Sequence, residues 1–190
     1  GNGQTCVALS CSAVPASGAL TIPASVTAIG DSAFLDCSVL TSLSFESGSE
    51  LETLGYLAFG GSGLTSIIIP ASVTTIGGRA FKGCSDLTSL SFESGSELVT
   101  IGSSAFESSG LTSIIVPASV TVIGNSAFLQ CSDLTSVTLR CGASALTIDS
   151  AAFDNTGVTS FALPSTATVT YTGSVSTSTL TCSSVGTDCS

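Results

Sequence analysis

The chain contains no histidine, tryptophan or methionine among its 190 residues, and Lys and Arg together number only three. Without histidine, neither a Ser-His-Asp nor a Cys-His catalytic arrangement can form. Because phosphate neutralisation needs clustered cations, the three basic residues and the formal charge of -10 argue against nucleic acid as a partner. The same shortage of cations disfavours binding to an anionic membrane surface.

Long apolar runs are also missing, and none approaches the roughly 20 residues that a membrane-spanning helix requires. We therefore expect no membrane insertion. Because a chain without Met cannot begin at its own initiator, we expect a processed N terminus and a secretion signal that has been removed. Hydrophobic residues nevertheless make up 43% of the chain, which is enough for a substantial core.

The sequence is organised as a repeat. The string LTSIIIPASVTTIGGRAFKGCSD at 64–86 returns 47 residues later as LTSIIVPASVTVIGNSAFLQCSD at 111–133, and units of 23 and 24 residues alternate. A fixed period of this length is typical of a solenoid, in which each unit buries its apolar face against the next. We predict an N-terminal cap over 1–16, a solenoid over 17–163 with about seven to eight coils, and a degenerate last coil with a Ser/Thr/Cys-rich C-terminal cap over 164–190.

Each unit has an alternating run near its start, such as SIII at 66–69 in a shorter unit and SLSF at 89–92 in a longer one. The period of two predicts a strand, with Ile67, Ile69, Leu90 and Phe92 facing the core. A glycine comes before five of the six Ala-Phe pairs, at 30, 55, 77, 102 and 124, and we expect it to turn the chain onto the opposite side of the coil. The phenylalanines of these pairs occupy the same place in successive units and should stack as a continuous spine: Phe34, Phe59, Phe81, Phe106, Phe128 and Phe153.

The pattern L-T-S-x-x-I-P-x-S-V-T-x-I-G-x-x-A-F-x-x-C-S-x-L over about 17–163 resembles the BspA-like leucine-rich repeat. The resemblance implies a leucine-rich-repeat solenoid with a parallel β-sheet on one face and short helical or 3₁₀ segments around Ala-Phe on the other. It also implies an extracellular protein, secreted or at a cell surface, that acts in adhesion or protein binding. Individual functional residues are not fixed across that family, so none is carried over.

Paired carboxylates are the remaining candidates for chemistry, and they lie at equivalent turns of the longer units. Glu46, Glu50 and Glu52 share one turn, and Glu93 and Glu97 share the next. Such pairs can perform general acid–base catalysis, but we interpret them as solvated turns that keep an apolar array soluble. No EF-hand spacing and no phosphate-binding glycine loop appears. We therefore expect no enzyme, no cofactor and no metal site.

The eight cysteines fall into two groups. Three recur in the link after Ala-Phe, where equivalent atoms two coils apart lie about 10 Å from each other, beyond disulfide reach. We interpret these three as buried thiols that bond the backbone of the link. The other five are candidate disulfide cysteines near the two ends, and because five is odd, at least one is free, paired between molecules or paired with a thiol of the first group. The thiol group is Cys37, Cys84 and Cys131, and the candidate disulfide group is Cys6, Cys11, Cys141, Cys182 and Cys189.

The outward positions of the predicted sheet form two columns of small, uncharged side chains, which are the candidate binding surface. Trp, Tyr and Arg, which dominate binding hot spots, are nearly missing, and this weakens the case for high-affinity protein recognition. Three interpretations stay open: a non-enzymatic scaffold that binds a protein or glycan surface, a subunit that stacks on copies of itself in a filament or surface layer, and an ice- or crystal-surface-binding protein. The abundant Ser and Thr are candidate sites for O-glycans. The surface comprises Ser42, Ser44, Ser66, Ile68, Ser89, Ser91, Ser113, Ile115, Ser136 and Thr138.

Overall fold

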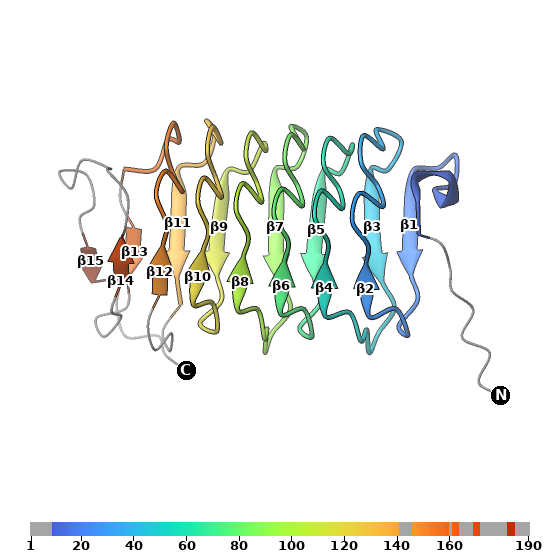
Figure 1. The fold of residues 1–190 in the computed structure, drawn as a ribbon, viewed down its shortest axis with the longest axis horizontal. Helices are drawn as coiled ribbons and strands as arrows, with labels where there is room; N and C mark the ends of the chain where they lie inside the picture. The colour runs from blue at the N-terminus through green and yellow to red at the C-terminus, as the bar shows by residue number, and fades with distance from the viewer. Residues whose placement is uncertain (1–8, 141–145, 160, 164–168, 172–181, 185–190) are drawn as a thin grey trace.

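The chain winds as a regular coil in which every turn contributes one longer and one shorter strand (Figure 1). The computed structural model describes residues 9–140, 146–159, 161–163, 169–171 and 182–184. The strands of the first layer are β1 (Ala19–Ile22), β3 (Ser42–Phe45), β5 (Ser66–Ile69), β7 (Ser89–Phe92), β9 (Ser113–Val116), β11 (Ser136–Leu139), β13 (Phe161–Leu163) and β15 (Cys182–Ser184). The strands of the second layer are β2 (Ala28–Ile29), β4 (Thr53–Leu54), β6 (Thr75–Ile76), β8 (Thr100–Ile101), β10 (Val122–Ile123), β12 (Leu146–Ile148) and β14 (Val169–Tyr171).

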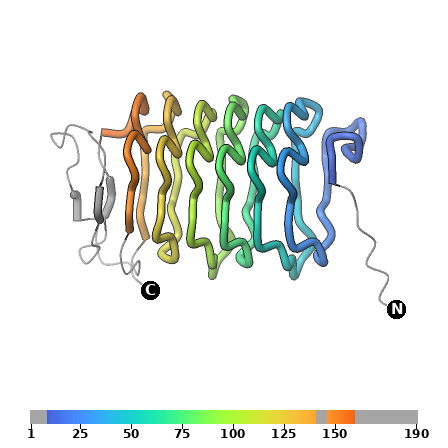
Figure 2. The backbone as a smooth tube through the Cα atoms, in the orientation of Figure 1, coloured from blue at the N-terminus to red at the C-terminus, as the bar shows by residue number. Residues whose placement is uncertain are grey.

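Both layers are parallel, and the coils follow one another along a single axis (Figure 2). The second layer is one seven-stranded sheet, in the order β14-β12-β10-β8-β6-β4-β2. The first layer is divided into two four-stranded sheets, β1-β3-β5-β7 and β9-β11-β13-β15. The leucine-rich-repeat solenoid with a parallel sheet on one face is confirmed, whereas the second parallel sheet was not predicted.

The phenylalanine spine lies between the two layers and is confirmed. Neighbouring rings stack with centroids 5.0–5.4 Å apart and planes within 9° of parallel. This spacing follows from the distance of about 4.8 Å between neighbouring strands, and it lies within the favourable range for stacked aromatic rings. Ile67, Ile69 and Leu90 are buried as expected, but Phe92 is only half-buried. The described coils with a stacked phenylalanine number six, so the expectation of seven to eight coils was slightly high.

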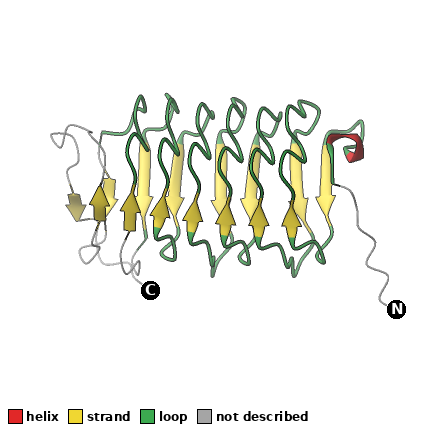
Figure 3. Ribbon diagram, viewed as in Figure 1, coloured by secondary structure: helices red, strands yellow, loops and turns green. Residues whose placement is uncertain are grey.

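The segment around each Ala-Phe pair consists of successive overlapping turns, three of them in the first coil, so the helical segments expected there are wrong. In the first coil, Ala33 N–H donates to Gly30 O at 3.3 Å, and Cys37 N–H donates to Phe34 O at 3.2 Å. Between them, Phe34 N–H donates to Ala58 O of the next coil at 2.7 Å. Because alternate N–H groups point to the neighbouring coil, they are not available for the bonds within a segment that a helix requires. The 3₁₀ turn Cys11–Ala13 is the one helical element in the described part of the chain (Figure 3).

At these turns, residues other than glycine adopt the left-handed backbone conformation. Ten of the described non-glycine residues have positive φ, and two of them, Ser32 (56°) and Asp36 (54°), are the third residues of the first coil's turns. Such a conformation costs on the order of 1 kcal/mol or more, and it persists only where surrounding structure enforces it. The enforcing contacts are the bonds between coils, since Ser32 N–H and Asp36 N–H donate to carbonyls of the next coil at 2.8 and 2.7 Å.

In the second to fifth coils the glycine before the Ala-Phe pair lies close against the preceding coil, while the residues after it make the turn. A Cβ on Gly102 would lie 2.6 Å from the Gly78 nitrogen of the preceding coil. A Cβ on Gly30, which lies in the first coil, would meet nothing within 4 Å. The close contact is therefore found only where another coil precedes the glycine, and in the sixth coil Asp149 stands at the same place.

The N-terminal end of the core is covered by a short segment that a disulfide holds in place. Cys11 is bonded to Cys37, with Cα atoms 5.5 Å apart, and Leu9 and Val14 pack against the buried core. The interpretation of Cys37 as a free buried thiol is therefore wrong. Its counterpart Cys84 donates to a carbonyl of the preceding coil, but Cys37 has no preceding coil, and Cys11 occupies that side instead.

The role of the glycine is tested by the pair Gly102→Ala and Gly30→Ala. Gly102→Ala should lower the free energy of unfolding by about 1–3 kcal/mol, because the added methyl forces the coils apart. Gly30→Ala should be neutral or stabilise by up to about 1 kcal/mol, because alanine restricts the unfolded chain. Urea unfolding followed by circular dichroism measures both, and equal effects would contradict the stacking argument.

The spine predicts a second ranking of stabilities. Phe81→Ala, at the centre of the stack, should reduce the free energy of unfolding by about 3–5 kcal/mol through the cavity that it leaves. Ser66→Ala, on the exposed face of β5, should change it by less than about 0.5 kcal/mol. The same urea unfolding assay measures both variants. A reversed ranking would mean that the inward and outward faces of the strands are assigned the wrong way round.

Candidate functional site

The predicted binding surface is the outer face of the first layer. In β3, β5, β7 and β9 both outward residues are exposed, and in β11 Ser136 is exposed while Thr138 is half-buried. The surface is not uniformly polar, because Ile68 and Ile115 keep 58% and 49% of their side-chain area accessible. The two isoleucines occupy the same column in alternate coils, with Ser91 between them. That this face binds a partner stays a prediction.

A seam divides this face where a longer unit is followed by a shorter one. At this junction β3 and β5 pair only through Ser42 and Ser66, and β7 and β9 belong to separate sheets. Proline is the cause, because the residue that follows the strand in the shorter units, such as Pro117, has no N–H to give to the preceding coil. In the longer units the same position donates normally, as from Glu93 N–H to Ile69 O at 3.0 Å.

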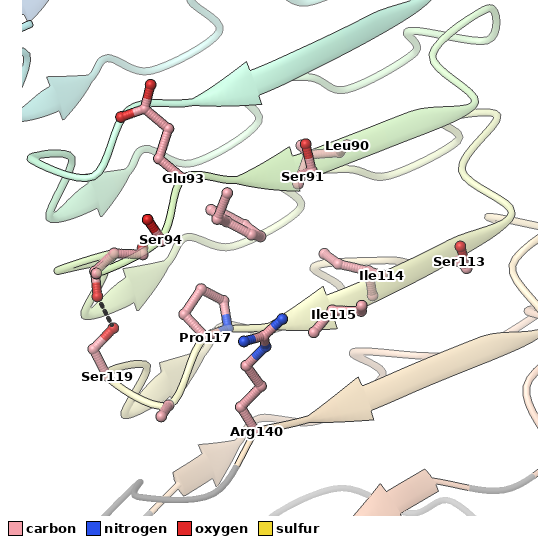
Figure 4. Close-up of a pocket in the computed structure, with 14 residues that line it drawn as sticks. Leu90, Ser91, Glu93, Ser94, Ser113, Ile114, Ile115, Pro117, Ser119 and Arg140 are labelled. Carbon is pink, nitrogen blue, oxygen red and sulfur yellow. Dashed lines mark hydrogen bonds between the residues drawn. The ribbon is translucent and has the colours of Figure 1, made fainter. Parts of the chain in front are cut away.

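A serine side chain supplies part of the missing connection across each seam. Ser72 Oγ donates to Ser49 O at 3.0 Å and to Leu51 O at 2.8 Å. Ser119 Oγ makes the equivalent bond to Ser96 O at 2.9 Å (Figure 4). The Pro-Ala-Ser string of the repeat therefore has a structural explanation, since the hydroxyl replaces a backbone donor that proline lacks.

The seam between β7 and β9 opens into a cavity of about 470 Å³. Its apolar lining residues are Leu90, Phe92, Ile114, Ile115, Pro117 and Ala118, and serines, Gly95, Glu93 and Arg140 complete the lining (Figure 4). The incomplete burial of Phe92 follows from its place beside this cavity. Ser91, Ser113 and Ile115 of the predicted surface also belong to the lining, so the cavity lies on the candidate face.

Glutamates of the longer turns hold the coil before them and are not merely solvated. Glu46 Oε2 accepts the N–H of Ala24 at 3.0 Å, and Glu93 Oε2 accepts the N–H of Ala71 at 3.0 Å. In the third longer unit the equivalent residue is Arg140, which cannot accept a hydrogen bond. The column Glu46, Glu93, Arg140 is visible in the sequence and could have identified Arg140. The predicted surface contained only the two columns of small residues and therefore missed it.

Two of the three cations have partners on the turn side of the solenoid, which is the side formed by the Ala-Phe turns. Arg79 donates to the Tyr56 hydroxyl and lies 5.7 Å from the centre of its ring, and Lys82 forms an ion pair with Glu107 at 2.9 Å. Desolvation would raise the pKa of the Glu107 carboxyl, but hydrogen bonds from Lys82 and Ser104 outweigh it and lower the pKa overall. The Arg140 guanidinium has no ion pair or hydrogen bond with the residues that the structure describes.

The two remaining thiols of the ladder are sealed in the core. Cys84 Sγ donates to Phe59 O at 2.9 Å, and Cys131 Sγ donates to Phe106 O at 2.9 Å. Desolvation raises the pKa of both thiols above the ordinary value of 9.0, and hydrogen bonds from Ser62 and Ser109 only reduce this effect. Of the candidate disulfide cysteines other than Cys11, residues Cys6, Cys141 and Cys189 lie outside the described residues, and for Cys182 only the backbone, in β15, is described.

Within the described ranges, no three His, Cys, Asp or Glu side chains converge on a potential metal site. The same residues include no helix that is long and apolar enough to cross a membrane.

The profile of a family described as the BspA type leucine rich repeat region matches the chain in six copies, over residues 16–135 and 52–181. No curated protein sequence matches it. Among solved structures, the chain resembles the pneumococcal vaccine antigen PcpA, at 22% identity and a TM-score of 0.65 over 80% of this chain. It also resembles a leucine rich cell surface protein of Faecalibacterium prausnitzii, at 22% identity and a TM-score of 0.52 over 82% of this chain. The matches span 47% and 56% of those two proteins, and at this identity the likeness concerns the fold alone.

The raised pKa of the two buried thiols predicts a loss of stability at alkaline pH. Below the ordinary thiol pKa of 9.0, folded and unfolded chains both keep these protons. Above it the unfolded chain releases them first, so the free energy of unfolding falls as pH rises through the folded pKa. The double variant Cys84→Ala/Cys131→Ala should start less stable but show a flatter dependence between about pH 8 and pH 10.5, measured by urea unfolding. Equal slopes in the two proteins would contradict the assignment.

Proposed function

The chain belongs to the BspA-type leucine-rich repeat family, and from this premise we propose that it is a non-enzymatic scaffold that binds other proteins through the outer face of its first layer. One observation carries the proposal: Ile68 and Ile115 stand exposed in a face that is otherwise built of small polar residues. Protein interfaces commonly combine an apolar centre with a polar rim. The face is also held by the stacked core beneath it, so little order has to be gained on binding.

The proposed location is the outside of a cell, where such a scaffold would act in adhesion. The Cys11–Cys37 disulfide supports this, because disulfides persist in oxidising compartments. The shared fold with a protein described as a leucine rich cell surface protein is a further point in favour. The shortage of Trp, Tyr and Arg on the face favours modest affinity per site, with several coils contributing together.

Three alternatives are weaker. For a glycan partner, the side chains described on this face include no exposed aromatic ring on which a sugar could stack, since the exposed Tyr56 follows β4 of the second layer. For a filament, the N-terminal end of the core is already covered by Leu9, Cys11 and Val14. For an ice or crystal surface, a flat and evenly spaced sheet is needed, and the break between β7 and β9 interrupts the array.

The experiment compares two charged variants on opposite sides of the solenoid. The purified chain is immobilised and exposed to a panel of purified extracellular proteins and, separately, to a glycan array. We expect one or more proteins to bind, and binding to fall at least about tenfold in Ile68→Asp/Ile115→Asp, because a charge at the centre of an apolar interface is desolvated without a partner.

The matched control is Val99→Asp, at an apolar residue that is similarly exposed (43%) but lies beside β8 of the second layer. It should leave binding unchanged. Equal loss in both variants would place the binding surface elsewhere, and binding to glycans without binding to any protein would overturn the proposed partner class.

A further inference from the structure

One column of the repeat changes its charge at the open seam. The residue that follows the first-layer strand of each longer unit is Glu46, then Glu93, then Arg140. Glu46 and Glu93 each reach back to the coil before them and accept a backbone N–H that the adjoining proline turn leaves exposed. At Arg140 the same geometry therefore presents a donor where the two earlier coils present an acceptor.

The backbone N–H that loses its acceptor is that of Ala118. It is equivalent to Ala24 and Ala71, whose N–H groups lie 3.0 Å from the two glutamate oxygens. No residue of the described chain accepts a hydrogen bond from Ala118 N–H, although Ala118 is half-buried and lines the cavity. An unpaired donor and an unpaired guanidinium thus border the same cavity, in the place that a carboxylate fills twice elsewhere in the solenoid.

The lining around this pair is mixed: Ile115 and Pro117 are apolar, several serines are polar, and the Glu93 carboxylate is already hydrogen-bonded to Ala71 N–H. The Arg140 side chain extends along Pro117 toward Ile115, whereas the Glu93 carboxylate points away from it toward the β5 coil (Figure 4). Guanidinium groups bind carboxylates with strong, charge-assisted hydrogen bonds, and a low-dielectric setting strengthens them. The other two cations of the chain, Arg79 and Lys82, already have partners on the turn side.

We propose that the cavity between β7 and β9 binds an acidic side chain of a partner protein, with the carboxylate on Arg140 and Ala118 N–H and a neighbouring aliphatic residue against Ile115 and Pro117. The inference rests on the proposed protein-binding function and names the chemistry of its partner. The carboxylate takes the place of the missing glutamate. A peptide is favoured over a sugar acid because it can place an aliphatic side chain against the exposed Ile115 and against Pro117, beside the carboxylate.

The test is a nuclear magnetic resonance titration of the isotope-labelled full chain with the blocked tripeptide acetyl-Val-Glu-Val-amide. The backbone amide of Ala118 and the Nε–H of Arg140 should shift and saturate together. The peptide acetyl-Val-Gln-Val-amide should bind at least about tenfold more weakly, since it has the same shape without the charge. Glucuronate, a carboxylate without an aliphatic neighbour, should also bind at least about tenfold more weakly.

The repeat supplies matched variants. Arg140→Glu restores the glutamate of the earlier coils, so it should cap Ala118, keep the fold and abolish the shift. Arg140→Gln, which only removes the charge, should weaken binding by at least about tenfold. Glu93→Arg frees Ala71 N–H at the β3/β5 seam and should create a second responding amide at Ala71.

The inference would be overturned by shifts confined to Ser66 and Ile68, by glucuronate binding as well as the glutamate peptide, or by an Ala118 response that survives in Arg140→Glu. An absence of any shift with the glutamate peptide would overturn it too. The proposed function is tested separately, by the protein panel and the Ile68→Asp/Ile115→Asp variant, and its failure would be seen there. Panel proteins that bind normally to Arg140→Glu would reject the carboxylate site and keep the scaffold.

Discussion

The packing of each coil against the next at one strand spacing is the constraint on which the rest of this structure depends. It sets the 5.0–5.4 Å between phenylalanine rings, and it removes the Cβ from residues such as Gly102, which touch the coil before them. It also explains why Ser32 and Asp36 tolerate positive φ, since the bonds that hold them in that conformation run between coils. No coil could satisfy these groups alone, so the stability of the solenoid lies at the junctions.

The same dependence explains where the solenoid is irregular. A group that would bond to the preceding coil makes a different contact, or none, when that coil is absent or has a different sequence. Cys37, in the first coil, forms a disulfide with the N-terminal segment, whereas Cys84 and Cys131 donate to carbonyls behind them. Pro117 cannot bond to the longer unit before it, so β7 and β9 separate and a cavity forms. The features that are candidates for function therefore arise at breaks in the repeat.

The candidate surface includes a regular part of the solenoid and a part where the repeat is broken. The regular part offers a rigid face of small residues with Ile68 and Ile115 exposed, which supports a role as a binding scaffold. The irregular part adds one cation, Arg140, beside an N–H that has no acceptor among the described residues, in a recess lined by apolar residues, serines and Glu93. In a chain with a formal charge of -10, a cation on the candidate face that has no ion pair within the described part of the chain is a specific feature and can distinguish one acidic partner from many.

The sequence by itself determined the solenoid, the parallel strands of the first layer and the phenylalanine spine, because each of these follows from a period that is local to one unit. It also identified the outward columns, from Ser42 to Thr138, by simple alternation. The second sheet, the turns that replace the expected helices, the Cys11–Cys37 bond and the seam beside Arg140 were decided only by the tertiary structure. Each of these depends on which groups of one coil meet which groups of the next, and that contact joins residues more than 20 positions apart that no local pattern connects.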